Sequence, residues 1–304
     1  MTHSLARILA ILALPLLAAC AGAPQQQKAP AAVPGYEGVQ DGEFFIEPVP
    51  AQYLQEANRK TEVSYAGDEA PGTVVVDTYA RKLYLVGEGG TATRYAIAVG
   101  REGLAFRGTG VIGRKAEWPS WTPTANMVRT RPDLYAAYAG GLPGGLQNPL
   151  GARALYLYRG GRDTMFRIHG TSDPASIGYA TSAGCIRLFN QDAIDLYNKV
   201  PIGTRVKVRT LEESEAMEGP QMLDAYGRTV PATPQNIAKK EKDAAAIARQ
   251  ESKDRVAAEK AEKKRLDFCA RRGIEPEDCP RPAPQDALVT VGTSDGTTAG
   301  SHSP

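Results

Sequence analysis

Hydrophobic and polar residues alternate along the middle of the chain, between about residues 71 and 210. Runs of β-branched and aromatic residues are separated there by glycine, proline and polar residues, a pattern that predicts strands joined by turns. The runs cover residues 73–79, 82–86, 94–99, 153–158, 165–169 and 205–209. We therefore expect a mainly β fold, with a sandwich or barrel-like sheet.

One helix interrupts the series of strands, over residues 190–200. Asn190 is a residue type that caps helices, Asp192 suits the positive end of the helix dipole, and Pro201 ends the helix. Apolar side chains recur on one face and predict the surface that packs on the sheet: Ile194, Leu196, Tyr197 and Val200. The predicted fold class is thus a β sheet with one or two packed helices.

The first twenty residues differ from the rest, because a short cationic stretch precedes an apolar run too short to span a membrane. This run ends in Leu-Ala-Ala-Cys, which resembles the lipobox of bacterial lipoproteins, and so predicts a signal peptide over 1–20 with Cys20 lipidated. An ordinary signal peptide that contains a cysteine is the alternative. Residues 21–70 are expected to form a flexible tether. We expect a periplasmic protein anchored to a membrane by its lipid, with Ala21 favouring the outer membrane.

The last part of the chain, residues 211–304, is expected to be a charged helical and low-complexity extension with a disordered end. Residues 237–266 contain ten Lys or Arg and six Asp or Glu, with apolar residues too sparse for a buried stripe. The whole chain has a formal net charge of +2 and lacks the clustered positive charge of a nucleic-acid site. Nucleic acid is therefore not an expected partner.

A long segment between predicted strands, residues 115–150, contains Trp118, Trp121 and several glycines and prolines. Segments of this length inside a compact domain usually serve a function. We interpret this one as a substrate loop over a site. In the alternative interpretation, the two indoles merely fill the end of the sheet.

Four cysteines and three histidines narrow the chemistry. Cys269 and Cys279 lie ten residues apart and can close a disulfide in an oxidising compartment, which leaves Cys185 as the unpaired thiol of the patterned region. His169 is the one histidine of that region, since the other two lie near the chain ends. Zinc sites draw on several Cys and His ligands, so no metal and no cofactor are expected.

His169 and Cys185 lie sixteen positions apart, joined by a loop rich in turn residues. A thiol is mostly protonated at pH 7, and an imidazole lets it attack as a thiolate and later returns the proton to a leaving amine. Gly184 permits a tight bend that presents the amides of Gly184 and Cys185 as oxyanion donors. Arg187 adds positive charge that favours the thiolate. The alternative for a lone cysteine is a buried core residue.

These residues resemble a known family, the L,D-transpeptidase (YkuD-type) catalytic domain. The matching motifs are HGT at residues 169–171, SAGCIR at 182–187, NPLG at 148–151 and IG at 177–178. The resemblance covers about residues 71–209 and predicts a catalytic domain over 71–210. One difference is Ala183, at a position where many members of the family have a second histidine.

The resemblance implies an enzyme of peptidoglycan biosynthesis that serves cell-wall organization and cell shape. Cys185 would form a thioester with the diaminopimelate carbonyl of a tetrapeptide stem, releasing D-Ala, and then transfer it to an amine acceptor. The acceptor would be a second stem, giving a 3-3 cross-link, or an outer-membrane protein to be anchored to the wall. His169, oriented by the carbonyl of Gly170, would be the base, while Ser182 and Arg187 would support geometry and charge. Carbapenems would acylate the same cysteine.

Two other functions remain open from the sequence. Water in place of the amine would make the protein an L,D-carboxypeptidase or a hydrolase. A non-catalytic wall-binding lipoprotein would act through its charged C-terminal helix and would not need Cys185.

Overall fold

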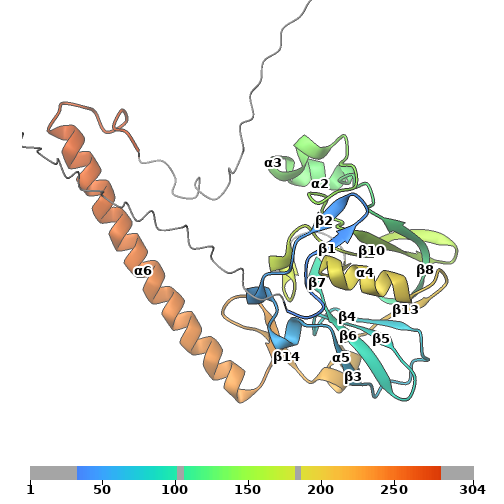
Figure 1. The fold of residues 1–304 in the computed structure, drawn as a ribbon. Coiled ribbons are helices and arrows are strands. Elements are labelled where there is room, and N and C mark those ends of the chain that lie inside the picture. Colours follow the sequence, from blue (N-terminus) through green and yellow to red (C-terminus); the bar gives the residue numbers. More distant parts are fainter. Residues whose placement is uncertain (1–32, 101–105, 182–185, 282–304) are drawn as a thin grey trace, which may run out of the picture.

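The computed structural model describes residues 33–100, 106–181 and 186–281 (Figure 1). The predicted signal peptide with Cys20, and the predicted site residues Ser182, Gly184 and Cys185, lie outside the described residues. The centre of the described part is one mixed sheet of 11 strands, which confirms the expected mainly β fold. In order across the sheet the strands are β11 (Ala180–Thr181), β7 (Ala98–Gly100), β12 (Ile186–Arg187), β10 (Arg162–His169), β9 (Arg153–Arg159), β8 (Gly108–Glu117), β13 (Arg205–Val208), β4 (Val74–Asp77), β5 (Lys82–Val86), β6 (Thr91–Ala96) and β3 (Thr61–Ser64).

The main hydrophobic core lies between this sheet and helix α4 (Asn190–Lys199), which contacts β9 and β10. Of the predicted helix stripe, Leu196 and Val200 are buried, while Ile194 and Tyr197 are half-buried. Burying one large apolar side chain stabilises a fold by about 1.5–3 kcal/mol, so this face is sufficient to hold the helix on the sheet.

The N-terminal segment is not a tether from residue 33 onward, and the expected tether over 21–70 is wrong for this part. Residues 33–64 form a hairpin of β1 (Val39–Asp41) and β2 (Phe44–Ile46), two short 3-10 helices η1 (Ala51–Tyr53) and η2 (Glu56–Asn58), and the edge strand β3. A few large side chains, Tyr36, Val49 and Leu54, are buried in a cluster with Phe189, just before α4. The sequence analysis did not predict this cluster, because these large residues are scattered among alanines and prolines and the composition of the segment is typical of a tether.

The segment 115–150 is only partly a loop. Strand β8 continues to Glu117, and the short helices α2 (Ala125–Thr130), α3 (Pro132–Tyr135) and η3 (Ala136–Tyr138) follow. Trp121 forms an isolated antiparallel bridge with Leu142, which closes the segment on itself. These residues therefore form an ordered lobe, seen at the top of Figure 1.

The C-terminal extension contains more than a charged helix. Helix α5 (Leu211–Glu218) begins with a capping box between Thr210 and Glu213, and a hairpin of β14 (Gln221–Leu223) and β15 (Thr229–Pro231) follows. The sequence analysis did not predict this hairpin, because its two strands have only three residues each.

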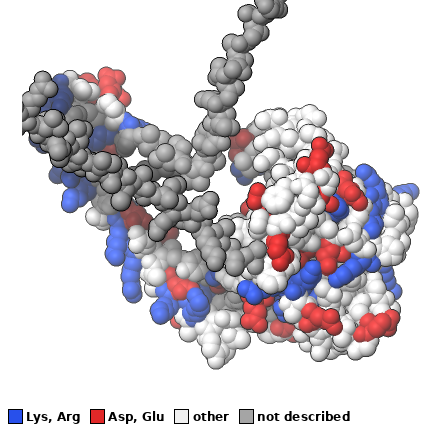
Figure 2. Space-filling view, viewed as in Figure 1, with Lys and Arg blue, Asp and Glu red and all other residues white. Residues whose placement is uncertain are grey.

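The expected long charged helix is present as α6 (Pro234–Ala270), which extends away from the sheet domain (Figure 1) and exposes Lys and Arg along its length (Figure 2). A disulfide joins Cys269, in the last turn of α6, to Cys279, which lies beyond the end of the helix. The sequence analysis had left open whether these two cysteines pair. Among the described residues, no helix is both long enough and apolar enough to cross a membrane.

Candidate active site

His169 is the last residue of β10 and is only 3% exposed. Its Nδ1 lies 2.6 Å from the carbonyl oxygen of Gly170. Because a carbonyl oxygen can only accept a hydrogen bond, Nδ1 must be the nitrogen that carries the proton, and Nε2 is left with a free lone pair. Burial, together with the positive charge of Arg187, lowers the pKa of His169 to about 3, while the hydrogen bond to the Gly170 carbonyl opposes this shift. The imidazole is therefore neutral at physiological pH and can accept a proton at Nε2.

Arg187 lies beside His169 across two paired strands. β10 and β12 are parallel, and His169 is the register partner of Arg187. Register partners in neighbouring strands project to the same face of a sheet. Of the predicted site residues that the structure describes, His169, Gly170 and Arg187 thus lie close together.

Asn190 holds the loop that follows His169. Its Oδ1 accepts hydrogen bonds from the backbone N–H groups of Ala152 (2.9 Å) and Thr171 (3.1 Å), and its Nδ2 donates to the carbonyl of Thr171 (2.9 Å). The sequence analysis assigned Asn190 to capping α4, but the cap is Phe189 and no side chain caps this helix. The Asn190 side chain therefore serves the site loop and not the helix.

Two glycines make room for this side chain. A Cβ atom on Gly170 or on Gly151 would lie 2.2 Å from Oδ1 of Asn190, closer than any real contact. Gly151 also has a φ of +62°, in the left-handed region that favours glycine. The Gly170 carbonyl, which fixes the tautomer of His169, is thus held in place by the packed side-chain amide of Asn190 and by the tight turn at Gly151.

A pocket of about 400 Å³ opens next to His169, and its lining includes Trp121, Tyr156, Phe166 and Arg167. Arg167 donates two hydrogen bonds to the Asp163 carboxylate (2.7 and 2.9 Å) and stacks on the Tyr156 ring, 4.2 Å from its centroid. The pocket therefore combines an aromatic and apolar wall with an arginine that is held in place by an ion pair.

The two tryptophans of segment 115–150 have different positions. Trp121 lines the pocket and packs near the rings of Tyr135 and Tyr138. Trp118 does not line it; its ring lies 4.3 Å from that of Phe44, in the N-terminal hairpin. The indole of Trp118 thus joins the hairpin to the lobe.

The hairpin is also tied to the strand next to His169 by charge. Arg153, in β9, donates hydrogen bonds to both carboxylate oxygens of Asp41 at 2.6 and 2.8 Å. Hydrogen bonds from the Arg153 guanidinium lower the pKa of Asp41, so this carboxylate is ionised at neutral pH. The carbonyl of Arg153 accepts a hydrogen bond from the N–H of Gly170 (3.0 Å). Sequence reasoning missed this contribution, since 112 residues separate Asp41 from Arg153.

No group of three or more His, Cys, Asp or Glu that could hold a metal ion occurs among the described residues.

Comparisons with known proteins place this geometry in a family. The family model of the YkuD L,D-transpeptidase catalytic domain matches residues 71–208. The chain is also 39% identical over 137 residues to a protein of Fuscovulum blasticum named "Putative L,D-transpeptidase in ATP synthase subunits region ORF 5", and the match covers 44% of this chain and 68% of that protein. The chain belongs to the L,D-transpeptidase catalytic-domain family.

Other relatives match about half of this chain. The probable L,D-transpeptidase YbiS of Escherichia coli K12 is 35% identical over 137 residues, covering 44% of this chain and 43% of that protein. A solved structure from Brucella melitensis, described as a probable carnitine operon oxidoreductase, is 45% identical, with 53% of this chain and 98% of that chain covered and a TM-score of 0.37. The match with the Escherichia coli relative thus covers less than half of each of the two chains.

Proposed function

We propose that this chain is a peptidoglycan L,D-transpeptidase in which Cys185 is the nucleophile and His169 the general base. The observation that carries the proposal is the 2.6 Å contact between Nδ1 of His169 and the carbonyl of Gly170, which leaves Nε2 free to accept a proton. The pocket beside His169 supplies space for a substrate. Membership of the family supports the reaction class and the cell-wall substrate.

Ile186, which follows Cys185 in the sequence, is the register partner of Ile168, which precedes His169. Neighbouring strands lie about 4.8 Å apart. This short distance between the two described chain segments supports a role for Cys185 in the same reaction as His169.

The proposed reaction has two halves. In the first, Nε2 of His169 takes the thiol proton, the sulfur bonds to the diaminopimelate carbonyl carbon of a tetrapeptide stem, and the protonated imidazole returns the proton to the leaving D-Ala amine. In the second, an acceptor amine gives a proton to Nε2 and attacks the thioester, which releases the thiol. The amides of Gly184 and Cys185 are proposed to bind the oxyanion, with Ser182 supporting the loop. Because Ala183 replaces the second histidine of many members, all proton transfer falls to His169.

Acylation is tested by intact-mass measurement after incubation with a carbapenem. The wild-type chain should gain one adduct, because Cys269 and Cys279 are joined in a disulfide and Cys185 is the remaining thiol of the proposed mature chain. Cys185→Ala should gain none, and His169→Gln should react at least ~10²-fold more slowly. An adduct on Cys185→Ala at the wild-type rate would exclude Cys185 as the nucleophile.

The acceptor is tested on wall material from cells with and without the protein, by digestion and separation of the muropeptides. Fewer 3-3 dimers in its absence mean that the protein cross-links stems, and fewer peptide-linked proteins mean that it anchors protein. An increase of either would identify a hydrolase, in which water resolves the thioester. If Cys185→Ala restores the wild-type pattern, the protein acts without catalysis.

We further propose that Cys20 is acylated and holds the domain in the periplasm, on the outer membrane. The lipobox-like Leu-Ala-Ala-Cys supports this proposal. Metabolic labelling with a radioactive fatty acid should mark the wild-type protein and leave Cys20→Ser unlabelled. A labelled Cys20→Ser protein would contradict acylation at this residue.

A further inference from the structure

Helix α6 carries a regular series of cations that the function proposed above does not use. Lys and Arg recur along it in alternating steps of seven and four residues, so the series repeats every eleven positions. Eleven residues are close to three turns of an α-helix, and the side chains therefore fall within a sector of about 60°, along a line about 44 Å long. We call this line the basic stripe. It consists of Lys242, Arg249, Lys253, Lys260, Lys264 and Arg271, the last of which follows α6 directly and keeps helical backbone angles.

The acidic residues of α6 lie mostly on its other sides. Of the seven Asp and Glu residues in the helix, only Asp267 falls within the sector of the basic stripe. Ala246 and Ala257 occupy two of the gaps between the cations, so a flat partner can approach the helix closely. The net charge of the helix does not reveal this separation, because the acids on the other sides offset the cations of the stripe.

Helix stability does not explain the stripe. A solvated helix is stabilised by opposite charges three or four positions apart, whereas Arg249–Lys253 and Lys260–Lys264 place like charges four apart, which is destabilising. All six side chains of the stripe are exposed, and none of them forms an ion pair within the part of the chain that the structure describes. Their positive charges are thus available to a partner.

An aromatic side chain lies beside the last cations of the stripe. Phe268 is 55% exposed, and it lines a surface depression together with Lys264, Arg271 and Arg272. The guanidinium of Arg272 lies over the Phe268 ring, 3.5 Å from its centroid. The disulfide at the end of α6 ties the segment that follows back to the helix, which holds this cluster in place.

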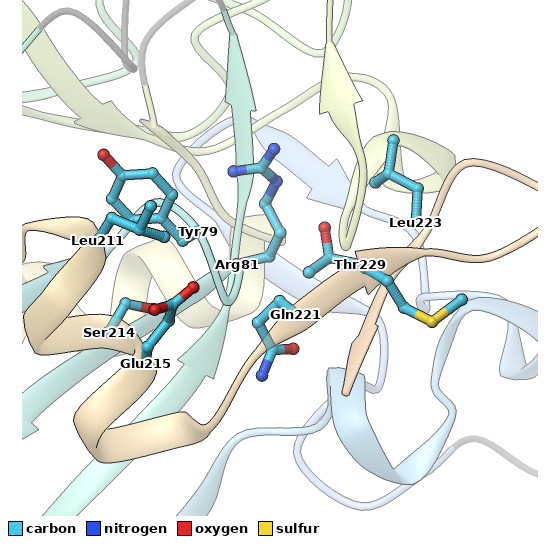
Figure 3. Close-up of a pocket in the computed structure, with 9 residues that line it drawn as sticks. Tyr79, Arg81, Leu211, Ser214, Glu215, Gln221, Leu223 and Thr229 are labelled. Carbon is cyan, nitrogen blue, oxygen red and sulfur yellow. The ribbon is translucent and has the colours of Figure 1, made fainter. Parts of the chain in front are cut away.

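The other end of α6 is fixed to the sheet domain. The side chain of Thr233 accepts a hydrogen bond from the N–H of Asn236 (3.2 Å), and Nδ2 of Asn236 donates to the carbonyl of Pro231 in β15 (2.8 Å). The N–H of Thr229, also in β15, donates to the carbonyl of Gly178 (3.4 Å). The β14–β15 hairpin lies against α5 and the turn between β4 and β5, with which it encloses a cavity (Figure 3). The domain therefore presents the stripe on a helix with a fixed base (Figures 1 and 2).

We propose that the basic stripe binds the surface of a membrane that contains anionic phospholipids, with Phe268 in the headgroup layer. A flat layer of phosphate groups complements a straight line of six cations, and every Lys or Arg near such a surface adds to the attraction. The exposed ring favours a lipid surface over a fully hydrated polyanion, because the boundary between headgroups and acyl chains takes up apolar groups. The proposal uses neither His169 nor Cys185, so it stands or falls independently of acyl transfer.

The test is co-sedimentation of residues 21–304 with lipid vesicles at low ionic strength. This chain keeps every described residue and lacks the apolar run and the proposed lipid, which would bind vesicles by themselves. Vesicles of equal parts phosphatidylglycerol and phosphatidylcholine should bind it, and vesicles of phosphatidylcholine alone should not. Lys253→Gln combined with Lys260→Gln should weaken binding at least about tenfold, since two cations leave the stripe. Added salt should weaken it as well.

The matched control is Lys240→Gln combined with Arg255→Gln. This pair removes the same charge from the opposite side of α6 and should leave binding nearly unchanged. Phe268→Ala should weaken binding at least about threefold without changing its dependence on salt, because the ring contributes apolar contact and no charge. Carbapenem acylation of all these variants should equal that of the parent chain, which separates this test from that of the proposed enzyme.

Co-sedimentation with purified peptidoglycan separates the cell wall from the membrane as the partner of the stripe. The stripe variant should bind peptidoglycan as the control variant does. Equal binding to the two kinds of vesicle, or equal binding by the stripe and control variants, would overturn the proposal. A loss of peptidoglycan binding confined to the stripe variant would overturn it too, and would make the stripe a surface for the wall.

Discussion

At the scale of single residues, the candidate site depends on groups that never touch a substrate. Asn190 supplies both acceptor and donor to the backbone around Gly170, whose carbonyl selects the tautomer of His169. If the loop that contains Gly170 shifts, Nδ1 of His169 loses its hydrogen-bond acceptor. The imidazole ring is then no longer held in one orientation, and neither is the lone pair of Nε2. A residue near the start of a helix thus determines whether the imidazole is ready to act as a base.

We expect Asn190→Ala to reduce both stability and acylation. The change leaves the N–H groups of Ala152 and Thr171 without their acceptor, at a cost of about 1–3 kcal/mol each if they stay dry. Thermal unfolding and the rate of carbapenem acylation measure the two effects. Asn190→Asp, which keeps the acceptor and loses the donor, should fall between Asn190→Ala and the wild type. Wild-type rates in Asn190→Ala would show that the loop does not need this side chain.

Asp192 is a carboxylic acid whose burial affects stability. It is fully buried and accepts a hydrogen bond from the hydroxyl of Tyr36 (3.2 Å), while its other oxygen has no hydrogen-bond partner. Burial raises its pKa to about 7, and the positive charge of Lys60 opposes this rise. The folded state therefore binds a proton that the unfolded state has already lost between about pH 4 and pH 7. Stability must fall as pH rises through this window.

Asp192→Asn should accordingly be more stable than the wild type at pH 8 and nearly equal to it at low pH. The wild type is expected to lose about 1.4 kcal/mol per pH unit from this group within the window. Denaturant unfolding at a series of pH values measures the difference. A difference between the two proteins that does not change with pH would contradict the assignment.

Single residues also show which parts of the candidate site could be predicted from the sequence. His169 and Arg187 were singled out because rare residue types in a glycine-rich motif point to chemistry, and the structure makes them register partners in neighbouring strands. The role of Asn190 was missed because an asparagine before an amphipathic run is a typical cap. Only the path of the chain from Gly151 to Thr171 reveals that its amide is used elsewhere.

At the scale of elements, the N-terminal hairpin packs beside the segments that form the site, although it does not line the pocket next to His169. Phe44 packs on Trp118, Asp41 pairs with Arg153, and Phe45 to Pro50 line a cavity of about 330 Å³ with Thr171 and Ser172, directly after the His169 motif. The sequence predicted strands wherever β-branched residues were dense. It could not predict the hairpin, whose partners Trp118 and Arg153 lie 74 and 112 positions along the chain from Phe44 and Asp41.

Asp41→Asn should loosen this hairpin. The change removes one charged partner from the buried guanidinium of Arg153, and we expect a loss of about 1–2 kcal/mol. The Asp41 pKa is lowered in the fold, so its contribution is present at neutral pH and disappears as pH falls through that pKa. Thermal unfolding at neutral and acidic pH measures both effects.

Asp133→Asn is the matched control, since it breaks the exposed Arg131–Asp133 pair and should not change stability measurably. Equal unfolding of Asp41→Asn and Asp133→Asn at neutral pH would mean that the hairpin does not depend on the ion pair.

At the scale of the whole molecule, contacts with the sheet domain continue beyond β13, through α5 and the β14–β15 hairpin. Glu218 and Ser214 satisfy the buried groups of Arg209 and Asp77, and Thr229 donates to the carbonyl of Gly178, just before β11. Composition had placed all of residues 211–304 in one extension. Because α6 is long and highly charged, its composition dominates this region, and the sequence analysis did not distinguish α5 and the β14–β15 hairpin from it.

Two truncations test these contacts. A chain that ends at Ala232 should unfold at the temperature of the full chain, because it keeps every partner of Arg209. A chain that ends at Thr210 leaves Arg209 without Glu218 and should unfold at a clearly lower temperature. Equal melting of the two truncated chains would show that α5 and the hairpin add nothing to the domain.

The early start of the packed domain has a consequence for the proposed lipid anchor. Only residues 21–32, twelve in number, separate Cys20 from the first described residue. Even a fully extended leash of this length reaches no more than ~40 Å. An acylated enzyme would then act on the layer of the cell wall nearest its membrane. Inserting residues into the segment 21–32 would let the domain reach farther from the membrane without changing its catalytic chemistry.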